Sequence, residues 1–176
     1  MADVIGSVLY TREQIEKRAE EIGKQITEDY KGEQLILVGI LRGAVMWMSD
    51  VMKNIDLEMT IDFMAVSSYG SSKKSSGIVK INKDLDTNIE DRNIIIVEDI
   101  VDSGITLNYL VGYLESRGAK SIRICSLLNK QCNRKVDLNA TYVGFDVDDL
   151  FIVGYGLDYD QRYRNLPYIT YLEDED

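Results

Sequence analysis

The sequence contains no histidine, and this absence removes several common catalytic arrangements. It excludes a serine–histidine triad, a zinc site with histidine ligands and an imidazole general base. Any acid–base chemistry must therefore use a carboxylate, a lysine, a tyrosine or a cysteine. Cysteine is also scarce: Cys125 and Cys132 form no disulfide framework, and Cys125 stands in an apolar run where it is expected to pack as a small apolar residue.

The chain also lacks a long apolar run, a signal-peptide pattern at its first residues and a basic stripe. We therefore expect a cytoplasmic protein with no membrane partner. The formal net charge is −10, which argues against nucleic acid as the main partner. An anionic substrate would consequently need local positive groups or a metal ion near it.

The 176 residues alternate between patterns typical of buried strands and of helices. A capping-box pattern at 11–14 precedes apolar residues at helical spacing. The predicted helices are 11–30, one that starts within 43–48, and 106–117; the predicted strands are 34–39, 57–65, one that starts at 79–81, 94–97, 121–128, 142–145 and 151–155. This order predicts an α/β fold with a largely parallel sheet covered on both faces, in one domain over 1–176. The Ser/Lys/Gly-rich segment 67–77 predicts a mobile loop.

The stretch IIIVEDIVDSGITL at 94–107 places unusual chemistry after the most apolar predicted strand. Ligands of such sheets bind beyond the carboxyl ends of the strands. Glu98 and Asp99 stand there, and ionised carboxylates can accept hydrogen bonds from a vicinal diol. They can also help to position a hard divalent cation, directly or through water.

The following turn favours a phosphate. At 103–106 a serine, a glycine and a threonine open the next predicted helix, where backbone N–H groups, the helix dipole and two hydroxyls all act as donors. The loop has no lysine, so neutral donors and the dipole must hold the anion. It matches neither the Walker loop nor the dinucleotide-binding fingerprint. A ribose 5-phosphate would satisfy both the acids and the loop.

The stretch at 98–106 resembles the phosphoribosyl-pyrophosphate (PRPP) motif of type I phosphoribosyltransferases. After a buried strand, this motif has two acids, two apolar residues, Asp, Ser, Gly, any residue and Thr. This resemblance implies that ribose phosphate is bound by Glu98, Asp99, Ile100, Val101, Asp102, Ser103, Gly104, Ile105 and Thr106. It also implies that family's fold, with a small hood subdomain built from about 1–10 and 150–176. The implied cofactor is Mg²⁺, with Glu98, Asp99 and Asp158 as its ligands.

The chain from about residue 10 to 169 is similar to the hypoxanthine-guanine phosphoribosyltransferases. The residues that match segments binding PRPP or its pyrophosphate are Leu41, Arg42, Gly43, Ser68, Tyr69 and Arg164. The Leu41–Arg42 peptide is expected in the cis form. The residues that match the purine-binding segments are Lys130, Phe151, Ile152 and Asp158. The similarity of the 67–77 loop is limited to Ser68 and Tyr69, and 131–141 has no functional match.

The purine-binding assignments have a chemical basis. The Lys130 ammonium can donate to a 6-oxo group but finds no acceptor in a 6-amino group, and Phe151 offers a ring face for stacking. Taken singly, Lys130 could be a surface lysine, Phe151 a core residue, Asp158 a turn residue, and Arg42 or Arg164 a solvated side chain. Only the combination favours a site.

The resemblance implies transfer of a 5-phosphoribosyl group from PRPP to N9 of hypoxanthine or guanine, as in purine salvage. Asp102 is then the candidate that accepts a proton from N7. A homodimer or homotetramer is expected. Other bases (adenine, xanthine, orotate or uracil) stay open as substrates, as do a nucleotide-sensing regulator that binds RNA and a catalytically inactive relative. The absence of a basic cluster weighs against the regulator.

Overall fold

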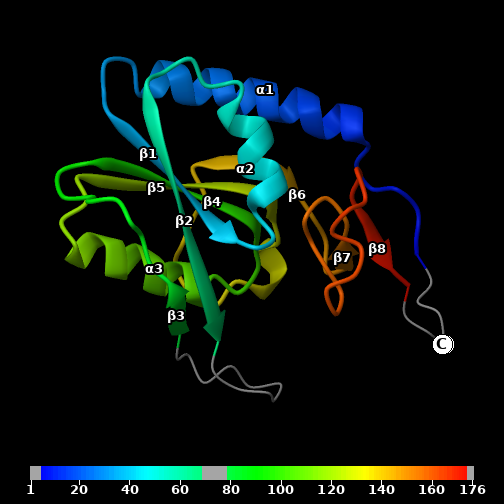
Figure 1. Ribbon diagram of the computed structural model, residues 1–176. Coiled ribbons are helices and arrows are strands. Elements are labelled where there is room, and N and C mark those ends of the chain that lie inside the picture. The colour runs from blue at the N-terminus through cyan, green and yellow to red at the C-terminus, as the bar shows by residue number, and fades with distance from the viewer. Residues whose placement is uncertain (1–4, 69–78, 174–176) are drawn as a thin grey trace.

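The computed structural model describes residues 5–68 and 79–173 (Figure 1). Within them, a six-stranded sheet has the order β3-β2-β1-β4-β5-β6, and β7 and β8 form a separate two-stranded sheet. The elements are α1 (Arg12–Asp29), β1 (Leu35–Leu41), α2 (Val45–Met52), β2 (Met59–Ser68), β3 (Val79–Lys83), β4 (Asn93–Val101), α3 (Ile105–Ser116), β5 (Ser121–Asn129), the 3₁₀ turn η1 (Gln131–Asn133), β6 (Tyr142–Asp146), β7 (Phe151–Val153) and β8 (Thr170–Leu172). In the larger sheet β3 alone runs antiparallel to its neighbour. The predicted α/β fold with a mostly parallel, helix-flanked sheet is confirmed.

Helices cover both faces of the sheet (Figure 1). Alternate residues of a strand point to opposite faces, so Leu35 and Leu37 join the core with α1 and α2, whereas Ile36 and Val38 join the core with α3. This two-sided burial explains why β1 and β4 are apolar without alternation. The capping box predicted at Thr11 is also present, since its side chain accepts from the Gln14 N–H and its own N–H donates to the Gln14 amide.

Several strand boundaries differ from the prediction: β1 and β2 each extend two or three residues beyond their predicted ends, and two further differences lie near the candidate site. The strand predicted at 94–97 continues to Val101, because Glu98 pairs with Ser126 and Val101 with Asn129 on the parallel strand β5. The strand predicted at 151–155 ends at Val153, because the chain then turns through Gly154, which has a φ of 96°. The strand β8 was not predicted.

The topology brings the ends of β1 and β4 together. From β1 the chain adds β2 on one side, and from β4 it adds β5 and β6 on the other, so the connections diverge between these two neighbouring strands. A switch point of this kind leaves a crevice at the carboxyl ends of the strands. The segments after Leu41 and after Val101 meet there.

Segments far apart in sequence meet beside the second sheet. Ile5 pairs with Leu172, and Tyr10 pairs with Ile169, so the first described residues join β8 next to β7 (Figure 1). The division into a main domain and a hood stays a prediction. The predicted mobile loop begins at the end of β2, and its part from 69 to 77 falls outside the described residues. Over the described ranges, every helix is too short or too polar to cross a membrane.

Candidate functional site

The loop after β1 lies directly against the acidic pair of β4. The Leu41–Arg42 peptide is cis, as expected. Gly43 follows it, and a Cβ placed on this glycine would lie 1.6 Å from Oδ2 of Asp99. Its carbonyl oxygen would in turn lie 2.2 Å from a Cβ on Gly156. Only a residue without a side chain can therefore connect these segments at position 43.

Glu98 and Asp99 are neighbouring carboxyl groups whose negative charges are only partly offset by hydrogen bonds and by Arg164. Burial raises the pKa of Glu98 well above its ordinary value, and the negative charge of Asp99 beside it raises it further. Burial also raises the pKa of Asp99, while hydrogen bonds and the charge of Arg164 oppose that change. The local backbone holds the pair, since the Asp99 N–H donates to Glu98 Oε1 at 3.1 Å and the Ile100 N–H donates to Asp99 Oδ1 at 2.7 Å.

The predicted phosphate loop begins where β4 ends. Gly104 has a φ of 78° and is the N-cap of α3, so the chain turns sharply before Ile105 starts the helix. The loop borders a cavity of about 130 Å³ whose lining residues are Glu98, Ile100, Val101, Asp102, Ser103, Gly104, Thr106 and Leu107. The acids and the loop thus lie together, as a ribose phosphate would require.

A second cavity, of about 250 Å³, shares Ile100 and Asp102 with the first. Its other lining residues are Asp99, Lys130, Leu150, Phe151, Ile152, Leu157 and Asp158. Asp102 is an exposed side chain at the boundary of the two cavities. The structure therefore places the candidate base between the predicted sugar-phosphate and purine sites.

The two candidate purine contacts differ in environment. Lys130 is buried at the end of β5, and its ammonium donates to the Leu150 carbonyl at 2.9 Å and to Asp149 at 3.4 Å. Phe151 is 53% exposed, with its ring edge-on to Tyr159 at a centroid distance of 5.4 Å. An aromatic ring this exposed at a cavity wall offers a face to a flat ligand.

A polar network follows the second cavity towards the loop after β1. Arg164 pairs with Asp158 at 2.9 Å and donates to the Gly156 carbonyl at 2.6 Å. Gln161 accepts from Arg42 at 2.8 Å and from Arg164 at 3.3 Å, which joins the two arginines. Nε of Arg164 is buried and has no partner within the described residues. The guanidinium N–H groups of Arg42 and Arg164 that have no partner in this network could donate to the oxygens of a pyrophosphate.

Gln161 was missed by the sequence reasoning, because a glutamine in a polar stretch carries no distinguishing pattern. Ser68, which was predicted to lie in the mobile loop, is the last residue of β2, and Tyr69 lies outside the described residues. Most of the other predicted residues line one of the two cavities or lie in the loop after β1. Ile105 lines neither cavity, and Arg164 contacts Gly156 and Asp158 in the segment after β7.

The predicted metal ligands do not converge as one group. Across 5–68 and 79–173 no three acidic or cysteine side chains are arranged to hold a metal ion, and Asp158 is engaged by Arg164. Glu98 and Asp99 nevertheless offer adjacent carboxylates whose mutual repulsion a cation would relieve, and oxygen donors are what Mg²⁺ prefers. The oxygen donors of Glu98 and Asp99 would therefore fit a hard divalent cation such as Mg²⁺.

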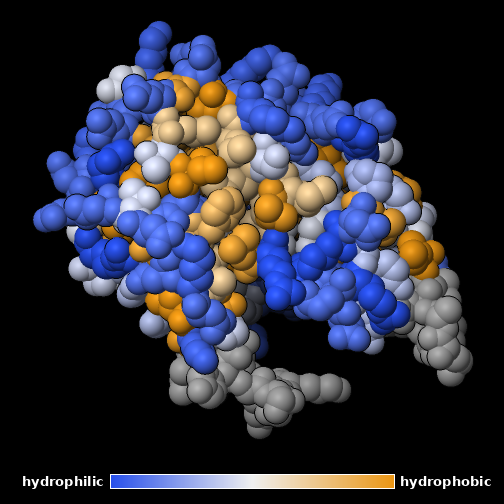
Figure 2. Space-filling model, viewed as in Figure 1, coloured by the Kyte–Doolittle hydropathy of each residue, from blue (hydrophilic) through white to orange (hydrophobic). Residues whose placement is uncertain are grey.

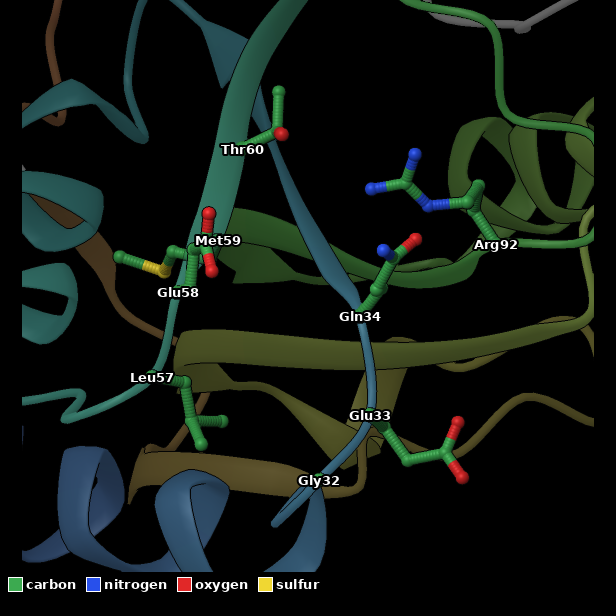
Figure 3. A pocket seen from close by; sticks show the side chains of 8 residues that line it. All are labelled: Gly32, Glu33, Gln34, Leu57, Glu58, Met59, Thr60 and Arg92. Atoms are coloured by element: carbon green, nitrogen blue, oxygen red, sulfur yellow. The ribbon is translucent and has the colours of Figure 1, made fainter.

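The pocket in Figure 3 lies at the opposite end of the sheet, where β1, β2 and β4 begin. It measures about 400 Å³ and is lined by Gly32, Glu33, Gln34, Leu57, Glu58, Met59, Thr60 and Arg92. None of the predicted site residues belongs to it. Its lining includes one arginine and two glutamates, a poor setting for an anionic substrate, so cavity volume alone does not identify the site.

Known proteins give a consistent match. A family model described as "Phosphoribosyl transferase domain" matches residues 7–160. The "Hypoxanthine-guanine phosphoribosyltransferase" of Bacillus subtilis is 53% identical over 96% of this chain and 94% of its own length. A crystal structure of a hypoxanthine phosphoribosyltransferase from Staphylococcus aureus has a TM-score of 0.93 and 48% identity, over 96% of this chain and 92% of that one. A hypoxanthine phosphoribosyltransferase from Trypanosoma cruzi, solved as a mutant in a ternary substrates complex, has a TM-score of 0.91 and 37% identity, with 96% of each chain covered. With the fold and the paired cavities, this similarity shows that the chain belongs to the phosphoribosyltransferase family, among the hypoxanthine-guanine phosphoribosyltransferases.

Proposed function

We propose that this protein transfers the 5-phosphoribosyl group of PRPP to N9 of hypoxanthine or guanine, forming IMP or GMP and pyrophosphate in purine salvage. The observation that carries the proposal is the pair of adjoining cavities, one bordered by acids and a phosphate loop and the other by Lys130 and Phe151. Ile100 and Asp102 border both cavities, and of these two only Asp102 can accept a proton.

Different groups of residues bind different parts of the substrate. The N–H groups and hydroxyls of 103–106 hold the 5-phosphate, and the carboxylates of Glu98 and Asp99 orient the ribose hydroxyls. Arg42 and Arg164 hold the pyrophosphate. Mg²⁺ bound by Glu98 and Asp99, with Asp158 near the pyrophosphate, would neutralise negative charge on the leaving group. Because the sugar becomes cationic as its anomeric bond breaks, alignment and charge stabilisation make the main contribution.

The purine is oriented by three contacts. Lys130 donates to the 6-oxo oxygen, Phe151 stacks on the ring, and Asp102 accepts the proton that leaves N7 as N9 forms its bond to the sugar. The Leu150 carbonyl already fixes the direction of the Lys130 ammonium. Binding of the base therefore costs little side-chain entropy at Lys130. These roles favour 6-oxopurines over adenine and pyrimidines.

The test is a magnesium-dependent assay of pyrophosphate release from PRPP, with hypoxanthine, guanine, xanthine, adenine, orotate and uracil in parallel. We expect turnover with the 6-oxopurines alone. Turnover with adenine or a pyrimidine would keep the PRPP site but contradict the roles of Lys130 and Phe151. PRPP binding without turnover of any base would favour a nucleotide-sensing regulator instead.

The assembly we propose is a homodimer or a homotetramer. Val45 and Met46 on α2 are 44% and 37% exposed, and Ile61 on β2 is 43% exposed. Figure 2 shows apolar side chains gathered on the face that carries α2 and β2. Such patches commonly mark contact surfaces between chains. Sedimentation of the wild type and of Ile61→Glu tests this, and a wild type that sediments as a monomer would contradict it.

A further inference from the structure

The segment between β5 and β6, which has no match to a functional motif, packs along the back of the phosphate loop. The Lys130 N–H donates to the Val101 carbonyl at 2.9 Å, and the Lys135 N–H donates to the Ser103 carbonyl at 2.9 Å. A Cβ on Gly104 would lie 2.9 Å from Cγ2 of Val136, so this side chain touches the loop as well. The segment therefore supports the loop on the side away from its cavity.

Arg134 is the centre of this support. Its Nε donates to the Asp102 carbonyl at 3.0 Å. Its Nη2 donates to Oδ1 of Asn129 at 2.7 Å and more weakly to the Val101 carbonyl at 3.4 Å, while Nη1 donates to the Leu138 carbonyl. One planar guanidinium thus joins the ends of β4 and β5 to the segment that follows. A single ammonium has no comparable set of divergent, fixed donors.

These contacts fix the direction of the loop's N–H groups. In a trans peptide the C=O and the next N–H point in opposite directions. Holding the carbonyls of Val101, Asp102 and Ser103 from behind therefore turns the N–H groups of the next residues, Asp102, Ser103 and Gly104, away from Arg134. The N–H groups of Ser103 and Gly104 donate no hydrogen bond within the described part of the chain, and both residues border the cavity of about 130 Å³.

We propose that Arg134 is a positioning residue that sets the orientation of the phosphate loop, and with it Asp102, without touching the substrate. This inference rests on the proposed function, in which that loop binds the 5-phosphate of PRPP. Arg134 also places a positive charge behind a loop that has no cation of its own. The segment of 131–141 is accordingly part of the phosphate site even though it contains no ligand to the phosphate.

The chain offers a matched control. Arg18 also donates to backbone carbonyls, with Nη2 2.8 Å from the Val143 oxygen and Nε 3.1 Å from the Gly144 oxygen, but these lie on β6 and border neither cavity. Arg134→Met and Arg18→Met each remove a guanidinium that caps carbonyls and keep much of the apolar stem. The free energy of unfolding that is lost by removing such a guanidinium should therefore be similar in both variants.

For Arg134→Met we expect the KM for PRPP to rise about 10- to 100-fold, since charge-assisted hydrogen bonds to the loop are lost. The KM for hypoxanthine should stay within about twofold, because Lys130 keeps its own contacts. Arg18→Met should leave both values unchanged. Arg134→Lys should resemble Arg134→Met, and millimolar guanidinium should restore part of the PRPP affinity of Arg134→Ala.

An Arg134→Met protein that melts lower, like Arg18→Met, but keeps the wild-type KM for PRPP would overturn the proposal. If Arg134→Met does not fold, the same comparison is made with Arg134→Lys.

If the wild type turns over no base, the proposed function fails on its own. The affinity for ribose 5-phosphate, measured by calorimetry in the wild type and both variants, then decides the role of Arg134: equal affinities would contradict it.

Discussion

The carboxylate of Asp99 occupies the space in which a side chain on Gly43 would begin. A Cβ there would lie 1.6 Å from Oδ2 of Asp99, and the carbonyl oxygen of the same glycine would lie 2.2 Å from a Cβ on Gly156. The loop after β1, the acids of β4 and the segment after β7 are thus in direct contact through one residue. A displacement of any of the three moves the others.

Gly43→Ala should therefore reduce catalysis while leaving the fold intact. We expect kcat/KM to fall about 100-fold or more, because displacements of about 1 Å have effects of this size on aligned reactions. The matched control is Gly112→Ala in α3, where an added Cβ meets nothing within 4 Å. Steady-state kinetics and melting temperatures of both variants test the prediction, and equal activities would contradict it.

Asp102→Asn should lower turnover far more than PRPP binding. The amide keeps the size of the side chain but cannot accept a full proton, so we expect kcat to fall about 100-fold or more while the Kd for PRPP changes about twofold at most. Asp160→Asn, an exposed residue outside both cavities, is the control. Unchanged turnover in Asp102→Asn would remove the base assignment.

Lys130→Gln should weaken recognition of the 6-oxo group. Loss of a charged donor to the purine is expected to lower kcat/KM for hypoxanthine and guanine about 10- to 100-fold. The KM for PRPP should not change. Lys120→Gln is the control, since Lys120 pairs with Glu33 at 2.9 Å at the other end of the sheet. Equal losses for hypoxanthine and PRPP would indicate a general distortion rather than a role in base recognition.

Tyr155→Phe should destabilise the protein. The Tyr155 hydroxyl is buried and donates to Asp50 on α2, which anchors the segment after β7 to that helix. Removing it leaves a carboxylate without this donor, at a cost of about 1–3 kcal/mol in the free energy of unfolding. Thermal denaturation should show a melting temperature lower by about 2–10 °C. Tyr109→Phe, at a tyrosine that is 42% exposed, should melt like the wild type.

Asp62 should make stability depend on acid pH. Burial by itself would raise the pKa of this carboxyl, but hydrogen bonds from the backbone N–H groups of Phe63 and Thr87 hold the pKa below its ordinary value. A lowered pKa in the folded state contributes stability above the unfolded-state pKa, and this contribution is lost as pH falls through the folded value.

Asp62→Asn should accordingly be less stable than the wild type at about pH 6, and the difference should shrink towards about pH 3. Urea denaturation at a series of pH values measures this. Asp137→Asn, at an exposed position, provides the reference for the general effect of acid. A difference between Asp62→Asn and the wild type that stays constant with pH would contradict the role of this carboxylate.

The order of elements was predictable because its signals are local. The capping box at Thr11, the apolar runs of β1 and β4, and the acids followed by a glycine turn before α3 each have a physical meaning that short stretches carry. The length of β4 was not predictable in the same way, since Glu98, Ile100 and Val101 are held by pairing with β5 rather than by their own propensity.

The candidate site residues were chosen from the sequence where ligand chemistry requires particular residue types, and their roles stay predictions. Gln161 and Arg134 were missed for a different reason: their roles come from contacts with residues brought close only by the fold. Arg134 reaches the Asp102 carbonyl across 32 positions of sequence, and Gln161 reaches Arg42 across 119. A sequence read by itself offers no signal for such contacts.

The pairing of β7 with β8 has a consequence for how the protein is made. The six-stranded sheet is complete once β6 has been synthesised, but Phe151 and Ile152 pair with Leu172 and Tyr171, which emerge from the ribosome some twenty residues later. A nascent chain can thus form the loop between β4 and α3 before Phe151 has a partner strand. We expect a chain that ends between β6 and β8 to contain this loop but to lack the strand that pairs with Phe151 and Ile152 at the second cavity.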